Sequence, residues 1–148
     1  MAKNLSIFLF LIVLIGGGIG YSFYSDPELA AQKLFNLTLK EFARNSESLE
    51  SEFEAKGRLT SSTRTLRVDF EHADMADSEV LVNMSIGSNN VTLTFSDQGS
   101  ILSNQTIILE PYKKDSQVRW KCINGTVLIR NRDKNCRLGY GIARSELL

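Results

Sequence analysis

Two cysteines are the residues of this sequence with the most definite chemistry. Cys122 and Cys136 are the only cysteines of the chain, and both lie in the stretch "VRWKCINGTVLIRNRDKNCR", residues 118–137. Two thiols at this spacing can form a disulfide in an oxidising compartment, whereas a structural zinc site as a rule takes four ligands. The single histidine, His72, is far away in the sequence, so a zinc site is poorly supported. The choice between paired and free thiols therefore depends on the compartment in which the protein resides.

The first part of the sequence bears on that compartment. Residues 5–24 read "LSIFLFLIVLIGGGIGYSFY" and carry no charged side chain. This is about the length that a helix needs to cross the hydrocarbon layer of a bilayer, roughly 20 residues. Lys3 precedes the run and Asp26 follows it, which favours an N-terminus in the cytoplasm and an exported remainder. The run is therefore interpreted as a single membrane anchor.

A cleaved signal peptide is the alternative to an uncleaved anchor. Its apolar region would be residues 5–15, with Gly18-x-Gly20 as a weak cleavage motif, and the lack of an Ala-x-Ala motif there favours the anchor. Both alternatives place residues 26–148 outside the cytoplasm. Two cysteines in such a compartment usually pair, so we expect a disulfide between Cys122 and Cys136.

Other residue patterns give little indication of catalysis. His72 lies beside Glu71 and Asp74, and a lone histidine next to acids at a strand end is typical of a solvated surface group. No nucleophile motif and no phosphate-binding loop occurs in the sequence. Charge is balanced, with 17 basic and 17 acidic residues, so nucleic acid is not an indicated partner. We therefore expect a protein that is not an enzyme and that has no small-molecule cofactor.

The exported part begins with a helix signal. Asp26-Pro27-Glu28 combines a capping aspartate with proline at the first helical position, and Gly57 is a stop signal after Lys56. Within residues 26–56, one stripe at spacings of three and four is expected to pack on a sheet. It consists of Phe35, Leu39, Phe42, Ser46, Leu49 and Phe53. The opposite, charged face consists of Lys33, Lys40, Glu41, Arg44, Glu47 and Glu50.

Strand patterns follow the helix. Alternating apolar residues predict strands at 65–70, 79–86, 91–95, 106–110 and 118–122, and a last short strand at 126–129. Pro111 and "KKDS" are expected to separate the fourth strand from the fifth. The apolar face of this sheet needs a cover, and the amphipathic helix is the only one that the sequence offers.

The expected fold class is α+β. One long N-terminal helix, formed by the membrane span and the amphipathic half, is expected to pack on an antiparallel sheet of four to six strands. The expected domains are an anchor, residues 1–25, and an exported domain, residues 26–148. Within the exported domain, residues 26–56 would form the helix and residues 65–148 the sheet and the disulfide-closed loop.

The C-terminal half of the sequence resembles the type IV pilins. "VTLTF", "TIILEP", "VRWKC" and "KNCR", all within residues 91–137, follow one another as in the C-terminal half of type IVa major pilins. In those pilins a V-x-W-x-C strand leads into a loop that closes on a second cysteine, often followed by arginine. The corresponding residues here are Trp120, Cys122, Cys136 and Arg137. The resemblance implies a pilin-like fold with this loop at the exposed edge, where it contributes to subunit contacts.

The resemblance does not extend to the N-terminus. Prepilins carry a short basic leader ending in glycine and a glutamate within the apolar segment, whereas residues 5–24 contain no acid and no such glycine precedes them. The expected N-terminus in cells is therefore Met1 or Ala2. The expected function is an atypical pilin-like structural or accessory protein of a type IV pilus or related secretion machine. It would be anchored in the inner membrane, and its partners would be the membrane and pilus or secretion-machine subunits.

The alternative function is an anchored, exported binding module unrelated to filaments. Such a module would hold its partner through its sheet edge or its C-terminal loop. That loop contains the one local excess of positive charge in the sequence, which is either a contact for an acidic partner or an ordinary solvated loop. The candidate interaction residues are Trp120, Arg130, Arg132, Lys134 and Arg137. For Trp120 the alternative, which we favour, is an ordinary aromatic residue of the core.

Overall fold

The computed structural model of the chain describes residues 26–70, 79–96, 101–139 and 141–148. Two helices come first, α2 (Pro27–Asn45) and α3 (Glu47–Lys56). The strands are β1 (Ser62–Asp69), β2 (Glu79–Ile86), β3 (Val91–Phe95), β4 (Thr106–Lys114), β5 (Gln117–Asn124) and β6 (Gly141–Ala143). Between β5 and β6 lie the 3-10 helix η1 (Ile129–Asn131) and helix α4 (Lys134–Leu138), and α5 (Arg144–Leu147) follows β6.

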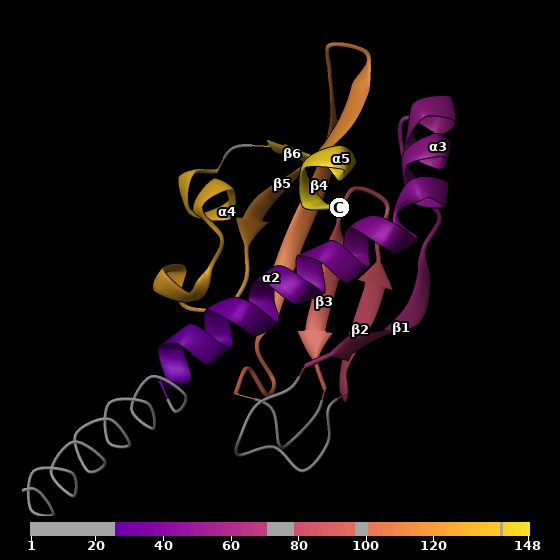
Figure 1. Cartoon of the computed structure of the whole chain (residues 1–148). Coiled ribbons are helices and arrows are strands. Elements are labelled where there is room, and N and C mark those ends of the chain that lie inside the picture. Colours follow the sequence, from indigo (N-terminus) through magenta and orange to yellow (C-terminus); the bar gives the residue numbers. More distant parts are fainter. Residues whose placement is uncertain (1–25, 71–78, 97–100, 140) are drawn as a thin grey trace, which may run out of the picture.

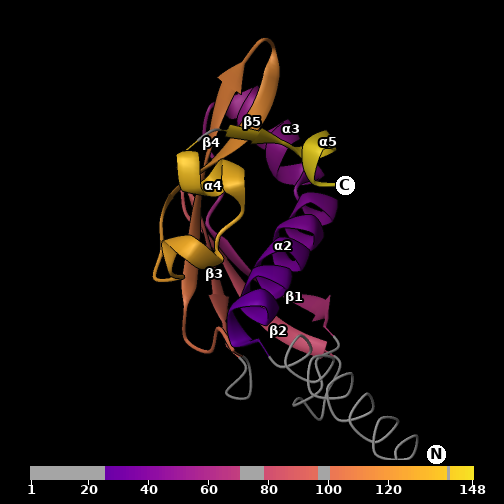
Figure 2. The ribbon, with the colours of Figure 1, turned by 60° about the vertical axis from the view of Figure 1, so that its left-hand side comes forward.

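The strands form one six-stranded antiparallel meander in the order β1-β2-β3-β4-β5-β6, so the protein is α+β. Successive side chains of a strand point to opposite faces, and here every second one is buried. Helix α2 runs obliquely across the sheet (Figures 1 and 2). One core joins the helix to the sheet, and its largest fully buried side chains include Phe35, Phe42, Phe95, Met84 and Trp120.

The expectation of one long N-terminal helix, with a membrane span as its first half, is wrong. The first described helix starts at Pro27 and the helical run is broken at Ser46. Within the described residues, no helix is long and apolar enough to cross a membrane. The side chain of Asp26 accepts the backbone N–H of Glu28 at 2.9 Å, so α2 has its own N-cap. Residues 5–24, where the span was expected, lie outside the described residues.

Residues on both sides of the break between α2 and α3 accept hydrogen bonds from a residue near the C-terminus. Ser46 is fully buried, and its hydroxyl lies 3.1 Å from the Ala43 carbonyl and 3.1 Å from the Glu50 carboxylate. Arg144 of α5 donates from Nε to the Ala43 carbonyl at 2.9 Å and from Nη2 to Glu47 at 2.8 Å. Carbonyls at a helix end need such partners. The C-terminal residues therefore stabilise the point where the helix changes direction.

The hairpin of β4 and β5 is longer than expected. Pro111 lies inside β4 opposite Trp120 and does not separate the two strands. β3 pairs with β4 only as far as Leu109, so Pro111 occupies a stretch with one free edge, where a residue without an N–H is tolerated. The turn is Asp115-Ser116, and both residues have positive φ, 51° and 62°, as a two-residue hairpin turn of type I′ requires.

Glu52, at the connection from α3 to β1, is expected to make the stability of the protein depend on pH. Hydrogen bonds from the Thr60 hydroxyl and from the Lys56 ammonium group lower the pKa of Glu52 from its ordinary value of 4.5 to about 2. A lowered pKa in the folded state means that this stabilisation is present above pH 4.5 and is lost as the pH falls toward 2. We expect the stability difference between wild type and Glu52→Gln, measured by urea denaturation, to shrink over this range. Glu54→Gln, exposed on the same helix, is the matched control, and an equal pH dependence in both variants would contradict the assignment.

Candidate interaction surface

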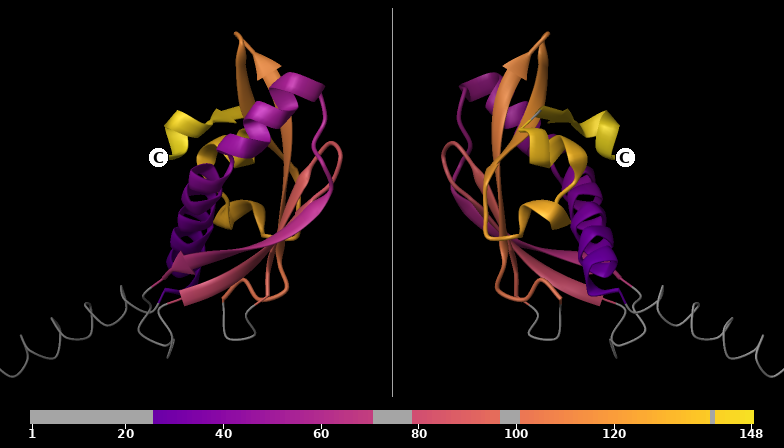
Figure 3. Two further views of the ribbon diagram at one scale, coloured as in Figure 1. Left: turned by 90° about the vertical axis from the view of Figure 1, so that its right-hand side faces the viewer. Right: turned by 90° about the vertical axis from the view of Figure 1, so that its left-hand side faces the viewer.

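The expected disulfide between Cys122 and Cys136 is present. It joins β5 to α4, with Cα atoms 5.0 Å apart and both side chains buried in the core. Helix α4 starts two residues before the second cysteine, because the Asp133 side chain caps it by accepting the backbone N–H of Asn135 at 2.7 Å. Residues 122–136 are called the clipped segment below. Both ends of this segment are fixed to the core. The path of its backbone beside the sheet can be followed in Figure 3.

A bulge and a glycine set the path of the clipped segment as it leaves β5. The register between β4 and β5 shifts so that Ile123 is an extra residue on β5, which bends a strand locally. Gly125 has a φ of 132° and passes so close to β4 that a Cβ atom there would overlap the Thr106 carbonyl. Only glycine combines this conformation with this approach. The chain therefore stays against the start of β4 as it leaves β5, and the backbone N–H of Val127 donates to the Thr106 carbonyl at 3.3 Å.

Arg132 holds the clipped segment together from inside. Its side chain is half-buried and donates from Nε to the Val127 carbonyl at 2.9 Å and from Nη2 to the Gly125 carbonyl at 2.8 Å. The sequence grouped Arg132 with the candidate interaction residues, but its guanidinium group is used by the backbone of the segment itself. The short strand expected at 126–129 is also wrong. The chain there turns into η1. The carbonyls of Gly125 and Val127 accept hydrogen bonds from Arg132, not from a neighbouring strand.

The other three cations of the candidate loop are exposed, but they do not meet at one point. The Nε atom of Arg130 is 3.7 Å from the Glu28 carboxylate of α2, and the Arg130 carbonyl accepts a hydrogen bond from Gln32 at 3.0 Å. Lys134 and Arg137 are exposed on α4. The structure therefore divides the predicted basic loop into one cation beside α2, one inside the loop and two on α4.

Trp120 lies in the core and not on the interaction surface. It is 1% exposed, and its ring meets that of Phe42 edge-to-face, with centroids 4.9 Å apart. Its Nε1 donates to the Glu50 carboxylate at 2.9 Å, which satisfies the polar atom of a buried indole. The sequence placed Glu50 on the charged face of the helix, but the change of direction at Ser46 turns it toward β5. No local pattern indicated this contact, because its partners are 70 residues apart.

The stripe predicted on the helix lies against the sheet over most of its length. Phe35, Leu39 and Phe42 of α2 are almost completely buried, and so is Leu49 of α3. Phe53, near the end of α3, is half-buried and packs on the margin of the core. The stripe positions the clipped segment indirectly, because Phe42 contacts Trp120 on the strand that carries Cys122.

Exposed apolar side chains are concentrated on and beside the clipped segment. Seven large apolar side chains are exposed among the described residues, and four of them are in the segment or within two residues of its end. These four are Ile123, Leu128, Ile129 and Leu138. Single exposed apolar residues are ordinary. Three on one covalently closed segment, with a fourth two residues beyond it, are more than such scattered exposure and make this segment the candidate contact surface of the domain.

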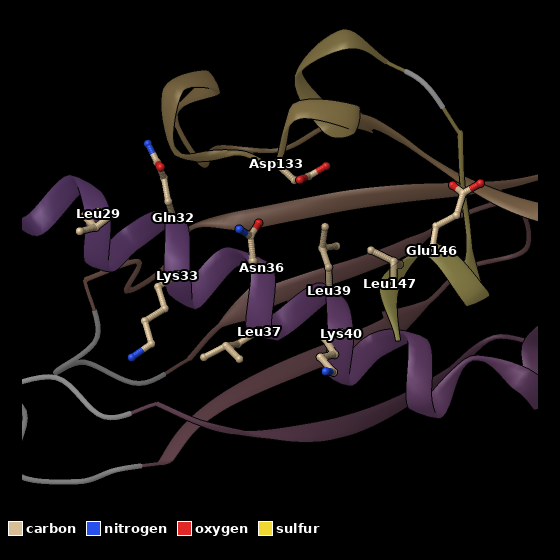
Figure 4. Close-up of a pocket in the computed structure, with 10 residues that line it drawn as sticks. All are labelled: Leu29, Gln32, Lys33, Asn36, Leu37, Leu39, Lys40, Asp133, Glu146 and Leu147. Atoms are coloured by element: carbon tan, nitrogen blue, oxygen red, sulfur yellow. The ribbon is translucent and has the colours of Figure 1, made fainter.

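Two depressions lie near this segment. The larger, of about 640 Å³, runs along α2 and is bounded by Asp133 and Leu147 on the side of the C-terminal elements (Figure 4). The second, of about 520 Å³, lies over β4 and β5 and includes Lys121 and Arg119. Arg119 already donates to Glu146 at 2.6 Å. The charged groups of the larger depression, Lys33, Lys40, Asp133 and Glu146, are spread along its walls and do not converge on one point.

Metal chemistry has no candidate in the parts of the chain that the structure describes, because no three His, Cys, Asp or Glu side chains there are grouped as metal ligands. His72, Glu71 and Asp74 lie outside those parts. The described features define a small α+β domain with a disulfide-closed, partly apolar contact segment. No protein-family model, no curated protein and no solved structure matches this chain.

Proposed function

We propose that this protein is a pilin-like structural or accessory subunit of a type IV pilus or related secretion machine, and that the clipped segment contacts neighbouring subunits. The observation that carries the proposal is the group of exposed apolar side chains on a segment held by a disulfide and by Arg132. A preformed surface loses little conformational freedom on binding. This property suits a contact that is repeated between subunits.

Two further observations support this proposal. A helix across an antiparallel meander, followed by a disulfide-closed C-terminal segment, is the arrangement that the resemblance to type IV pilins implies. Attachment at the inner membrane, with residues 26–148 outside the cytoplasm, is part of the proposal. It is supported by the uncharged sequence of residues 5–24 and by the disulfide, which is typical of exported proteins.

A binding module unrelated to filaments is a second candidate, favoured by the outer edge of β1. Among the described strands β1 pairs with β2 alone. Its first four residues, 62–65, are exposed on both faces of the sheet. Such an edge can accept an extended segment of a partner as an additional strand.

Leu138→Asp is expected to reduce the amount of the protein in pilus or secretion-machine assemblies. Leu138 is 56% exposed beside the clipped segment, and Leu148 is 55% exposed at the C-terminus, so Leu148→Asp is a matched control. Wild type and control are expected in sheared filaments or in purified membrane complexes together with pilus subunits. The amount of Leu138→Asp there should fall about tenfold, the effect of losing about 1.4 kcal/mol at a contact.

Mass spectrometry of the sheared and membrane fractions provides the measurement. If wild-type protein is missing from filaments and no pilus or secretion subunit accompanies it in membranes, the pilin-like function is refuted. Equal recovery of the Leu138 and Leu148 variants would refute the role of the clipped segment. In that case the edge of β1 would become the leading contact.

A further inference from the structure

Three exposed apolar side chains gather at one corner of the domain, where α2 begins. Leu29 in the first turn of α2 is 53% exposed, and Leu128 and Ile129 at η1 are 51% and 66% exposed. Two contacts bring the two elements together. Gln32 of α2 donates to the Arg130 carbonyl at 3.0 Å, and the Glu28 carboxylate lies 3.7 Å from Arg130 Nε. Leu29, Leu128, Ile129 and Arg130 are called the α2–η1 corner below.

We propose that the α2–η1 corner rests in the interfacial layer of the membrane, with its apolar side chains at the boundary between headgroups and acyl chains. This inference rests on the proposed attachment through residues 5–24. It adds a second contact with the lipid that is made by the folded domain. The domain would then have a fixed orientation on the membrane, with its η1 side toward the lipid.

Chain geometry places the corner near the lipid once the attachment is granted. The uncharged run ends at Tyr24, and Asp26 is two residues further on. A residue spans at most about 3.5 Å, and a helix rises about 1.5 Å per residue. Leu29 is therefore within roughly 12 Å of the end of the run. The headgroup layer on each side of a bilayer is about 5–8 Å thick, so the corner reaches it or lies immediately above it.

The chemistry of the corner suits that layer. Interfacial segments combine apolar side chains, which enter the acyl boundary, with cations that meet lipid phosphates. Ile129 and Arg130 are adjacent in η1, and the Arg130 side chain is 67% exposed. Asp26 and Glu28 at the same end are acidic. Attraction to anionic lipids is therefore not the main contribution to the free energy of membrane contact. The contact is mainly apolar and is expected with zwitterionic lipid.

The corner is rigid before it meets the lipid. The disulfide fixes both ends of the clipped segment, and Arg132 holds its middle through the carbonyls of Gly125 and Val127. Leu128 and Ile129 are therefore presented without the cost of ordering a loop. Of the four exposed apolar residues on and beside the clipped segment, these two face the lipid. Ile123 and Leu138 remain for neighbouring subunits.

A fluorescence experiment on the full-length chain tests this inference. Ile129→Cys introduces the only free thiol, because the two cysteines of the chain are paired, and the thiol is labelled with a nitrobenzoxadiazole dye. Leu148→Cys is the matched control: it is exposed to a similar degree and lies beyond α5, which contacts the helix break at Ala43. That break is 15 residues along α2 from Glu28, or roughly 22 Å. Both proteins are reconstituted into phosphatidylcholine vesicles with and without spin-labelled lipid.

Two readouts separate this inference from the proposed function. Sedimentation with the vesicles after an alkaline wash reports attachment, and dye emission with lipid quenching reports depth. The expected result is sedimentation of both proteins, with a blue shift and lipid quenching for the Ile129 dye and neither effect for the Leu148 dye. Sedimentation with water-like emission from both dyes would overturn the corner contact and leave the attachment standing. A blue shift without lipid quenching would mean a protein contact and would also overturn it. Loss of sedimentation would refute the proposed attachment and this inference together.

Discussion

Replacement of Phe42 by alanine is expected to lower the free energy of unfolding by about 3–5 kcal/mol. Phe42 is fully buried, and its ring meets Trp120 with an interplanar angle of 88°. Alanine leaves a cavity between α2 and β5 and also removes a favourable edge-to-face aromatic contact. A small domain is stable by about 5–15 kcal/mol in total. The variant would therefore lose a large part of its stability.

Asn36→Ala is the matched control for this measurement. Asn36 is exposed on the same helix, and a surface substitution of this kind usually changes stability by no more than about 0.5 kcal/mol. Urea denaturation can be followed through Trp120, the only tryptophan, which contacts Phe42 directly. Equal losses in both variants would show that α2 is not held against β5 by this contact.

The helix illustrates how far periodicity predicts structure. Spacings of three and four were enough to place Phe35, Leu39 and Phe42 against the sheet, because an α-helix repeats its faces at that period. The break at Ser46 was not predictable from the same pattern. Ser46 fits the stripe, and the group that satisfies the end of α2 is Arg144, 101 residues from Ala43. A local pattern carries no information about such a distant partner.

In the sheet, too, the features set by local sequence were predictable, and those set by distant contacts were not. The strands β2 and β3 have the predicted bounds, because alternation and turn residues are local signals. Pro111 was taken as a boundary since proline interrupts a paired strand, but one edge of β4 is free at that point. The segment at 126–129 had a strand-like composition. Its path was decided by Gly125 and by the carbonyls that Arg132 binds.

The candidate site was predictable as a segment, but not residue by residue. The pairing of Cys122 with Cys136 followed from the cysteine count and the expected export, and it fixes the ends of the segment. Exposure of individual side chains depends on tertiary contacts. Arg132 was therefore assigned to the surface although it binds the segment backbone. Trp120 was a candidate for both the surface and the core, and it lies in the core. Ile129 and Leu138 were not singled out, because an apolar residue in a loop gives no sequence signal of exposure.

Removal of the disulfide is expected to lower the free energy of unfolding by about 2–4 kcal/mol. The test variant replaces Cys122 and Cys136 together by alanine, which avoids an unpaired thiol in the core. The bond connects residues 14 apart, and closing a loop of this size restricts the unfolded chain by an amount in this range. The comparison is made by urea denaturation of the variant and of oxidised and reduced wild type. The reduced wild type should be destabilised like the variant.

Hydrogen exchange shows where this stability is lost. Both cysteines belong to the core, but neither takes part in the contact between the rings of Phe42 and Trp120. Without the bond, amides of the clipped segment and of α4 should exchange faster, while those of the central part of α2 should follow global unfolding only. Arg132 should keep the turn at Gly125 and Val127 partly protected. If oxidised and reduced protein unfold at the same urea concentration, the disulfide does not hold the segment. The rigid contact surface argued above would then lose its physical basis.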